Sequence, residues 1–237
     1  IPSMVVEEFD MAFHELYRRW KTRPFAILEA EGRLEAVELA ARAGIDLTYA
    51  DLRGLIAPLG FLPGVDLRGV DLTGGDLAGG YLRKADLRSS ILVGANLAGA
   101  RLREADLRYA DLRNAVFSGA DVRGVRLTGA RMEGTTIDWR WSGFAVELLG
   151  RDRDCRGDAL RLVAELAFED ESRPFGWLQT LFRNADSLEW ALGVLGRAIG
   201  PRDNAPDLLR RLAADAIVDS VVPLAPQRHW TRRARSA

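Results

Sequence analysis

The stretch that decides the fold is Ala105-Asp106-Leu107-Arg108-Tyr109-Ala110-Asp111-Leu112-Arg113-Asn114, in which Ala-Asp-Leu-Arg occurs twice, five residues apart. The same period extends in both directions, because a large apolar residue returns at every fifth position from 47 to 137, interrupted only by Ala57. A helix would spread such residues around its whole circumference, and a strand would alternate them between its two faces. Neither regular element explains a period of five.

Each five-residue unit has a fixed layout. A small residue stands two positions before the large one, Asp commonly stands between them, and Gly recurs two positions after the large one. A type II turn needs a positive φ at its third residue, which Gly adopts without steric cost. The layout therefore predicts a short extended piece followed by a corner, with one small and one large side chain facing a narrow interior. The large inward residues of the regular part are Leu67, Leu72, Leu77, Leu82, Leu87, Leu92, Leu97, Leu102, Leu107, Leu112 and Phe117.

These units resemble the pentapeptide-repeat family, whose pattern is A(D/N)LXX. The resemblance covers residues 45–139 and implies a β-solenoid, a right-handed quadrilateral β-helix with four units in each coil and about five coils. Two departures stand out: residues 55–63 contain two prolines and apolar residues at polar positions, and after Val125 Arg replaces Asp. At both places we expect an irregular wall or a bulge.

The flanking segments predict helices. Apolar residues recur at three-to-four spacing over 5–20 and 28–42, which makes residues 1–44 an N-terminal helical cap for the exposed solenoid end. Residues 140–225 form an α-helical domain, with helices near 142–149, 157–168, 175–183, 186–199 and 206–219, the fourth beginning with a capping box at Asp186. Residues 226–237 form a basic tail that we expect to be disordered.

Charge separates the function classes. The chain of 237 residues has 33 Lys and Arg against 34 Asp and Glu. Residues 46–139 contain ten Asp and two Glu against eleven Arg and one Lys, so the repeat segment is neutral. Family members associated with quinolone resistance mimic duplex DNA and engage a type II topoisomerase, which requires a dense negative surface. If residues twenty apart stack, each Asp column here has a neighbouring Arg column, so we rank a DNA mimic below a protein scaffold.

Catalysis finds little support in the sequence. The single cysteine, Cys155, cannot close an intramolecular disulfide, and the two histidines have no Ser or Cys partner at a recognisable spacing. We therefore expect no enzyme activity, no catalytic residue, no cofactor and no metal. No apolar run reaches the roughly 18 residues of a membrane span, and the first residues lack a signal-peptide pattern. We expect no membrane contact and a cytoplasmic, bacterial-type protein.

The function we predict is a non-catalytic scaffold that binds another protein. A low-charge corner of the solenoid is the candidate docking patch, formed by Ala78, Ile91, Val93, Ala98 and Val116. The first alternative is binding or protection of a type II topoisomerase, gyrase. The second is nucleic-acid binding, which we rank lower, through an electrostatic edge of Arg83, Arg88, Arg103, Arg108 and Arg123. The sequence leaves open a homodimer and coverage of the patch by the C-terminal helices.

Overall fold

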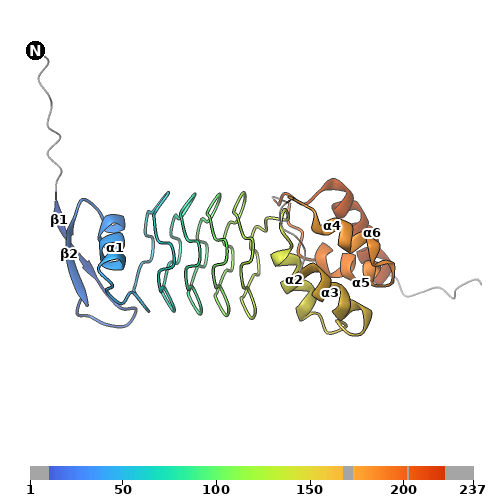
Figure 1. Cartoon of the computed structure of the whole chain (residues 1–237), viewed down its shortest axis with the longest axis horizontal. Helices are drawn as coiled ribbons and strands as arrows, with labels where there is room; N and C mark the ends of the chain where they lie inside the picture. Colours follow the sequence, from blue (N-terminus) through green and yellow to red (C-terminus); the bar gives the residue numbers. More distant parts are fainter. Residues whose placement is uncertain (1–10, 168–172, 202, 222–237) are drawn as a thin grey trace, which may run out of the picture.

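The structure, a computed structural model, describes residues 11–167, 173–201 and 203–221. Three parts follow one another along the long axis (Figure 1). At one end β1 (Ala12–Leu16) pairs antiparallel with β2 (Ala26–Ala30), and α1 (Arg33–Arg42) packs between this hairpin and the solenoid. The stacked coils follow. The far end consists of α2 (Ser142–Arg151), α3 (Asp158–Ala167), α4 (Trp177–Arg183), α5 (Ala185–Gly196) and α6 (Asp207–Val221).

The coils repeat every twenty residues. Isolated parallel bridges join positions twenty apart, from Asp51↔Asp71 to Val116↔Thr136. Four five-residue units therefore complete one turn of the solenoid. The bridges continue through the irregular stretch, where Ile56 pairs with Asp76 and Phe61 pairs with Tyr81, and they also include Asp111↔Arg131. The bulge expected at both ends is thus wrong, because outward substitutions do not disturb the inward side chains that set the phase.

Each corner is a tight turn closed by the backbone. The Ala110 N–H donates to the Leu107 carbonyl at 3.1 Å, and Tyr109 between them has a φ of 61°. This is the positive φ that a type II turn requires at its third residue. The recurring Asp also has a local role, since the Asp106 carboxylate accepts the backbone N–H of Arg108 at 3.2 Å. Asp is therefore frequent because it satisfies a donor that the extended piece leaves unpaired.

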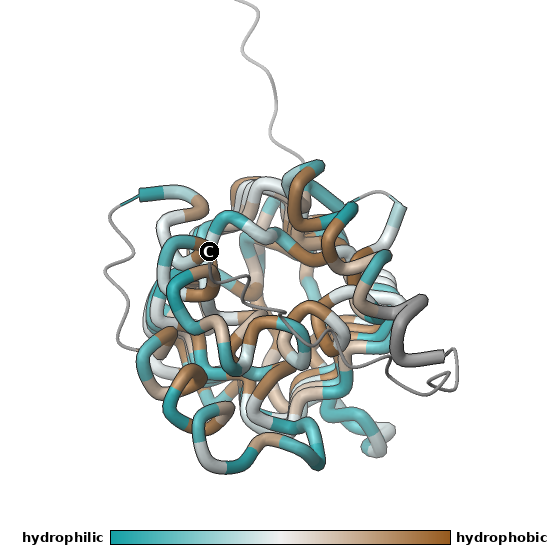
Figure 2. Tube along the Cα trace, turned by 90° about the vertical axis from the view of Figure 1, so that its right-hand side faces the viewer, coloured by the Kyte–Doolittle hydropathy of each residue, from teal (hydrophilic) through white to brown (hydrophobic). Residues whose placement is uncertain are grey.

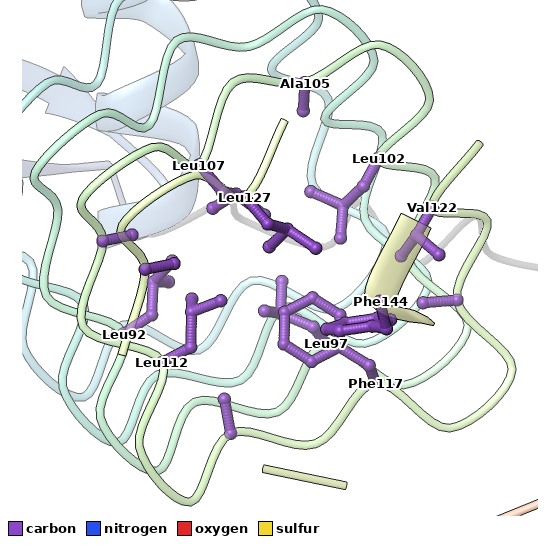
Figure 3. Packing of buried hydrophobic residues seen from close by; sticks show 14 of the residues in the cluster. Leu92, Leu97, Leu102, Ala105, Leu107, Leu112, Phe117, Val122, Leu127 and Phe144 are labelled. Atoms are coloured by element: carbon purple, nitrogen blue, oxygen red, sulfur yellow. The ribbon is translucent and has the colours of Figure 1, made fainter. Parts of the chain in front are cut away.

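One continuous core fills the solenoid and extends into both ends. The predicted inward residues from Leu67 to Phe117 are all buried, and Figure 3 shows those it labels pointing from the walls into the interior. Phe144 of α2 meets Phe117 edge to face at 5.3 Å between ring centroids, so the helical domain continues the same core. In Figure 2, which looks along the stack, the coils lie behind one another as nearly superposed outlines.

The coil backbone has a direction, so its two ends present different groups. Toward the N-terminal side each wall presents two carbonyls and one N–H. The carbonyls of Asp71 and Thr73, for example, accept N–H groups of the preceding coil, and the Asp71 N–H donates to a carbonyl of that coil. The N-terminal cap supplies matching donors, because Arg33 donates to the carbonyls of Asp51 at 2.6 Å and Arg53 at 3.2 Å. Arg18 donates to the Thr48 carbonyl. The cap thereby replaces a preceding coil and covers an edge open to aggregation.

Toward the C-terminal side each wall presents two N–H groups and one carbonyl, and there the partners are mainly acceptors. The Ile137 N–H donates to the Asp203 carboxylate at 2.9 Å, and the Trp139 N–H donates to the Asn204 side-chain oxygen at 2.7 Å. The Gly129 N–H donates to Glu147 at 3.2 Å. Side chains of the helical domain thus take positions that a further coil would occupy.

Two local predictions are wrong, and one lies outside the described residues. Residues 12–16, inside the helix expected over 5–20, form β1, and residues 26–30 form β2 before the helix α1 begins. Helical spacing failed because it assumed a buried Phe13, whereas this ring points outward and is 74% exposed. Asp186 is not a capping residue, since the N-cap of α5 is Asn184. The basic tail, 226–237, lies outside the described residues.

Candidate protein-docking face

The predicted docking patch falls on two adjoining walls of the solenoid. Ala78, Ala98 and Val116 lie on a wall that we call the third face, whose outward residues are 56, 58, 76, 78, 96, 98, 116 and 118. Ile91 and Val93 lie on the preceding wall. All five side chains are half-buried, and Ile91 is bridged on either side by Asp71 and Asp111. On the third face Ala78 and Ala98 occupy stacked positions twenty residues apart, and Val116 stacks on Asn96 in the adjacent column. Ile91, on the preceding wall, lies between two carboxylates.

Asp76 is the one charged residue among the outward positions of the third face. Its carboxylate accepts the backbone N–H of Ala78 at 3.1 Å and the side-chain amide of Asn96 at 2.9 Å. Because its charge is engaged within the wall, the third face offers small, weakly polar side chains over several coils. The helices α2–α6 lie beyond the last coil rather than along this wall (Figure 1).

Three exposed apolar side chains of the solenoid were missed by the sequence prediction. Ile56 is 74% exposed, Leu59 is 69% exposed and Phe61 is 54% exposed. We call these three residues the apolar cluster. Ile56 begins the third face, Leu59 occupies the next corner, and Phe61 begins the following wall. The signal for them in the sequence is the apolar departure at 55–63, which by itself predicts only an irregular wall.

Contacts with the next coil hold the apolar cluster in place. The Leu59 side chain lies over Gly79, where an added Cβ would come within 2.7 Å of it. The Phe61 ring packs against Tyr81 at 5.7 Å between centroids, and the Arg101 guanidinium lies 4.3 Å from the Tyr81 centroid on the other side. Leu59 and Phe61 are therefore ordered although exposed, and exposed apolar side chains that lie near one another commonly mark a protein contact.

The predicted electrostatic edge is balanced by acids. Arg88, Arg108 and Arg123 each bind the Asp two residues earlier, at 2.6, 2.6 and 2.5 Å. Arg83 and Arg103 both approach Glu104, at 3.2 and 3.5 Å. Every residue of this edge thus has a carboxylate neighbour, so the edge presents less net positive charge than the sequence spacing alone implies.

The same pairs perturb the carboxyl groups. Hydrogen bonds from Arg88 lower the pKa of Asp86 below its ordinary value, and those from Arg123 lower the pKa of Asp121, in both cases against the opposing effect of burial. The acids are therefore held in their charged form. A carboxylate stabilised in this way is a poor proton donor near neutral pH, so these columns offer little to acid–base chemistry.

Cations gather instead beside the N-terminal cap. A cavity of about 670 Å³ is lined by Arg18, Arg19, Lys21, Arg33 and Arg53, with Tyr17, Trp20, Thr22 and Asp51. The guanidinium of Arg33 is used to cap carbonyls, and Arg53 binds Asp51 at 2.6 Å. The sequence prediction missed this basic cavity because its residues come from segments that only the fold brings together.

Other chemistry has few candidates in the part of the chain that the structure describes. No group of three or more His, Cys, Asp or Glu side chains is placed to hold a metal ion among residues 11–167, 173–201 and 203–221. Burial, and then the nearby Asp152, raise the pKa of the half-buried Cys155 thiol, which makes it less reactive. Within the same ranges, no helix has both the length and the apolar character to cross a bilayer.

Comparison with known proteins agrees with this geometry. The pentapeptide-repeat family model matches eight copies, over residues 60–88, 66–103 and 95–134. The central segment is a pentapeptide-repeat domain. Proteins of this family fold as right-handed β-helices, in accord with the twenty-residue coil of this pentapeptide-repeat segment. No curated protein matched the chain significantly.

Several solved pentapeptide-repeat structures are similar to part of the chain. A protein of the Arabidopsis thaliana thylakoid lumen is 36% identical over 37% of this chain, with a TM-score of 0.28. This chain spans 64% of that protein's length. A protein from Nostoc PCC 7120 is 26% identical over 42% of this chain and 94% of its own length, with a TM-score of 0.35. QnrB1, a plasmid-mediated fluoroquinolone resistance protein, is 17% identical over 38% of this chain and 54% of its own length, with a TM-score of 0.25.

Proposed function

We propose that this protein is a non-catalytic scaffold that binds a protein partner through the third face and the apolar cluster. The observation that carries the proposal is the exposure of three apolar side chains near one edge of the third face. Ile56 lies on this face, whose other outward side chains are small and weakly charged, Leu59 lies at the next corner, and Phe61 begins the following wall. Exposed apolar side chains at an ordered position contribute more to association than rim charges do. The partner should therefore present a largely apolar, weakly charged surface.

A matched pair of substitutions tests the proposal. Leu59 and Tyr109 both occupy corners with φ near 61°, both lie over a glycine of the next coil, and they are 69% and 64% exposed. Asp tolerates a positive φ better than most residues, so Leu59→Asp and Tyr109→Asp should both fold. Capture from the native host, with crosslinking, should yield a partner with the unaltered protein and with Tyr109→Asp. Retention of that partner by Leu59→Asp would refute the proposal.

Topoisomerase binding and nucleic-acid binding are the alternatives, and the ion pairing supports neither. A DNA mimic must present uncompensated negative charge in place of phosphates. Here Asp86, Asp106 and Asp121 each bind the Arg two residues on. We expect the purified protein to leave DNA supercoiling by gyrase unchanged at micromolar concentration. Inhibition that weakens when Asp86 and Asp106 are changed to Asn would favour the DNA-mimic alternative instead.

A reducing cytoplasm is the compartment that we propose, because the single Cys155 offers no intramolecular disulfide. Binding of a protein partner through the third face would require neither a cofactor nor redox chemistry. Dimerisation through the same face is an outcome of the capture experiment, since a second copy of the chain would then be the protein recovered. Size-exclusion chromatography with light scattering distinguishes this case from a different partner.

A further inference from the structure

The last coil leaves one wall without a cap. The wall before the third face ends at Arg131, Met132, Glu133 and Gly134, which stack on Asp111 to Asn114 of the coil below. In every lower coil the equivalents of Met132 and Gly134 donate their N–H groups to the next coil, as Leu112 does to Arg131 at 2.8 Å. Within the described residues, the N–H groups of Met132 and Gly134 and the carbonyl of Ala130 have no hydrogen-bond partner. We call these three groups the open edge.

Each neighbouring wall of the last coil has at least one of its equivalent groups paired with the helical domain, whereas none of the three groups of the open edge is paired within the described residues. The third face gives its two N–H groups to Asp203 and Asn204, at 2.9 and 2.7 Å. The wall before the open edge gives the Gly129 N–H to Glu147, and the Ala120 carbonyl on the remaining wall accepts from Arg140 at 3.3 Å. The described residues of the helical domain therefore contact the last coil around the open edge without forming a hydrogen bond to it.

A cavity lies where the next rung would stand. It has a volume of about 580 Å³ and is lined by residues 132–137 of the last coil and by Leu148, Arg151 and 197–201 together with Asp203 of the helical domain. Its size falls within the roughly 300–1,000 Å³ of ligand sites. Met132, Leu148 and Ile199 give it apolar walls beside the open edge. An open strand edge next to such a cavity is the arrangement that binds extended peptides by strand addition.

We propose that the open edge binds an extended peptide, which adds one rung to this wall. The geometry of the lower coils fixes its hydrogen bonds. Arg131 donates its N–H to Ala110 and accepts from Leu112, and Glu133 accepts from Asn114. The first peptide residue would likewise donate to the Ala130 carbonyl and accept from Met132, and the third would accept from Gly134. The side chain of the second residue would then point inward, toward the cavity.

The same stacking defines the peptide's side chains. Its first residue would lie over Arg131, which approaches Asp111 below it at 3.5 Å and is 55% exposed, so an acidic residue fits there. Its second residue would be large and apolar, as Leu112 and Met132 are at the corresponding positions. Its third residue would lie over Glu133, in the same way that Glu133 lies over Arg113 in the coil below. A basic residue is favoured there because it would face the carboxylate of Glu133. The preferred segment is therefore acidic–apolar–basic, in the parallel direction, as in Asp-Leu-Arg.

The test uses the whole chain and a synthetic peptide, acetyl-Ala-Ala-Asp-Leu-Arg-Ala-amide, followed by NMR of the backbone amides and by fluorescence anisotropy of a labelled copy. We expect saturable binding that shifts and protects the amides of Met132 and Gly134. Methylating the Asp backbone nitrogen removes the donor to Ala130 and should weaken binding about tenfold or more. Unchanged affinity of the methylated peptide, protection elsewhere in the chain, or no binding at millimolar peptide would overturn the proposal.

A second pair of variants isolates the charge. Arg131→Glu should weaken binding of the Asp-Leu-Arg peptide roughly three- to tenfold. The same variant should bind a Lys-Leu-Arg peptide more tightly than the unaltered protein does. Arg126→Glu is the matched control, because Arg126 occupies the same position on the neighbouring wall, approaches Asp106 at 3.8 Å and is 68% exposed. Equal effects of the two substitutions would refute the placement of the peptide. The outward residues 56 to 118 that define the third face do not line this cavity, so failure of the scaffold proposal leaves the inference intact.

Discussion

Replacing Asp203 by Ala tests how the helical domain is joined to the solenoid. The carboxylate accepts three hydrogen bonds, from the Ile137 N–H at 2.9 Å, the Trp139 indole at 3.2 Å and the Gly200 N–H at 2.7 Å. A hydrogen bond to a charged group contributes about 1.5–3 kcal/mol when buried. Because Asp203 is half-buried, water replaces part of this loss, and we expect the unfolding free energy to fall by about 2–4 kcal/mol.

The expected fall is large enough to measure directly. For a chain of this size each kcal/mol shifts Tm by about 2–4 °C, so Asp203→Ala should lower Tm by roughly 5–15 °C. Asp203→Asn keeps one acceptor oxygen and should lose about half as much. Hydrogen exchange should accelerate at the amides of Ile137 and Trp139. Asp215→Ala, an exposed change on α6, is the control. If Asp203→Ala lowers Tm no more than this control does, or if the amides of Ile137 and Trp139 exchange at their original rates, the carboxylate does not cap the solenoid.

Three further predictions concern the solenoid. Gly129→Ala should lower the free energy of unfolding more than Gly94→Ala does, as measured by urea unfolding of the two variants. Both glycines have a positive φ, which strains any other residue. The new Cβ at position 129 would also lie 2.5 Å from the Tyr109 ring, whereas nothing lies within 4 Å of a new Cβ at position 94. Phe117→Ala should lower the unfolding free energy by about 3–5 kcal/mol in the same assay, because the ring is fully buried. Asp121 has a lowered pKa in the folded state, so its contribution is present above the ordinary pKa of Asp and is lost as pH falls through the lowered value. The stability difference between the unaltered protein and Asp121→Asn should therefore be greatest near neutral pH and shrink below about pH 4.

The period of five predicted the solenoid because it depends only on local chemistry. Leu107 and Ala110 set the turn, and every unit repeats the same solution, so the inward residues could be named from the sequence. The helices after residue 140 could also be located, since an apolar stripe within one helix is likewise a local pattern. The N-terminal hairpin could not, because Phe13 faces outward and gives the sequence a helical spacing that the structure does not use.

The candidate sites were harder to predict because they depend on contacts between distant segments. Asp203 lies 66 residues from Ile137 in the chain, and no local motif marks the pair. The open edge is visible only once it is known which groups the helical domain covers. For the docking patch, the sequence identified a low-charge wall but overestimated how apolar the surroundings of Ile91 are, because the stacking places Ile91 between two aspartates.

The apolar cluster follows from the same rule that explains the aspartates. In a regular unit the Asp carboxylate accepts the N–H of the residue two positions on, as Asp51 does from Arg53 at 3.3 Å. Two positions after Ile56 and Phe61 the chain has Pro58 and Pro63, which have no N–H to donate. A carboxylate there would have no backbone partner, so proline removes the local reason for Asp at these two positions. The prolines thus free two outward positions for apolar side chains while the coil keeps its phase, and a docking surface can form without loss of the solenoid.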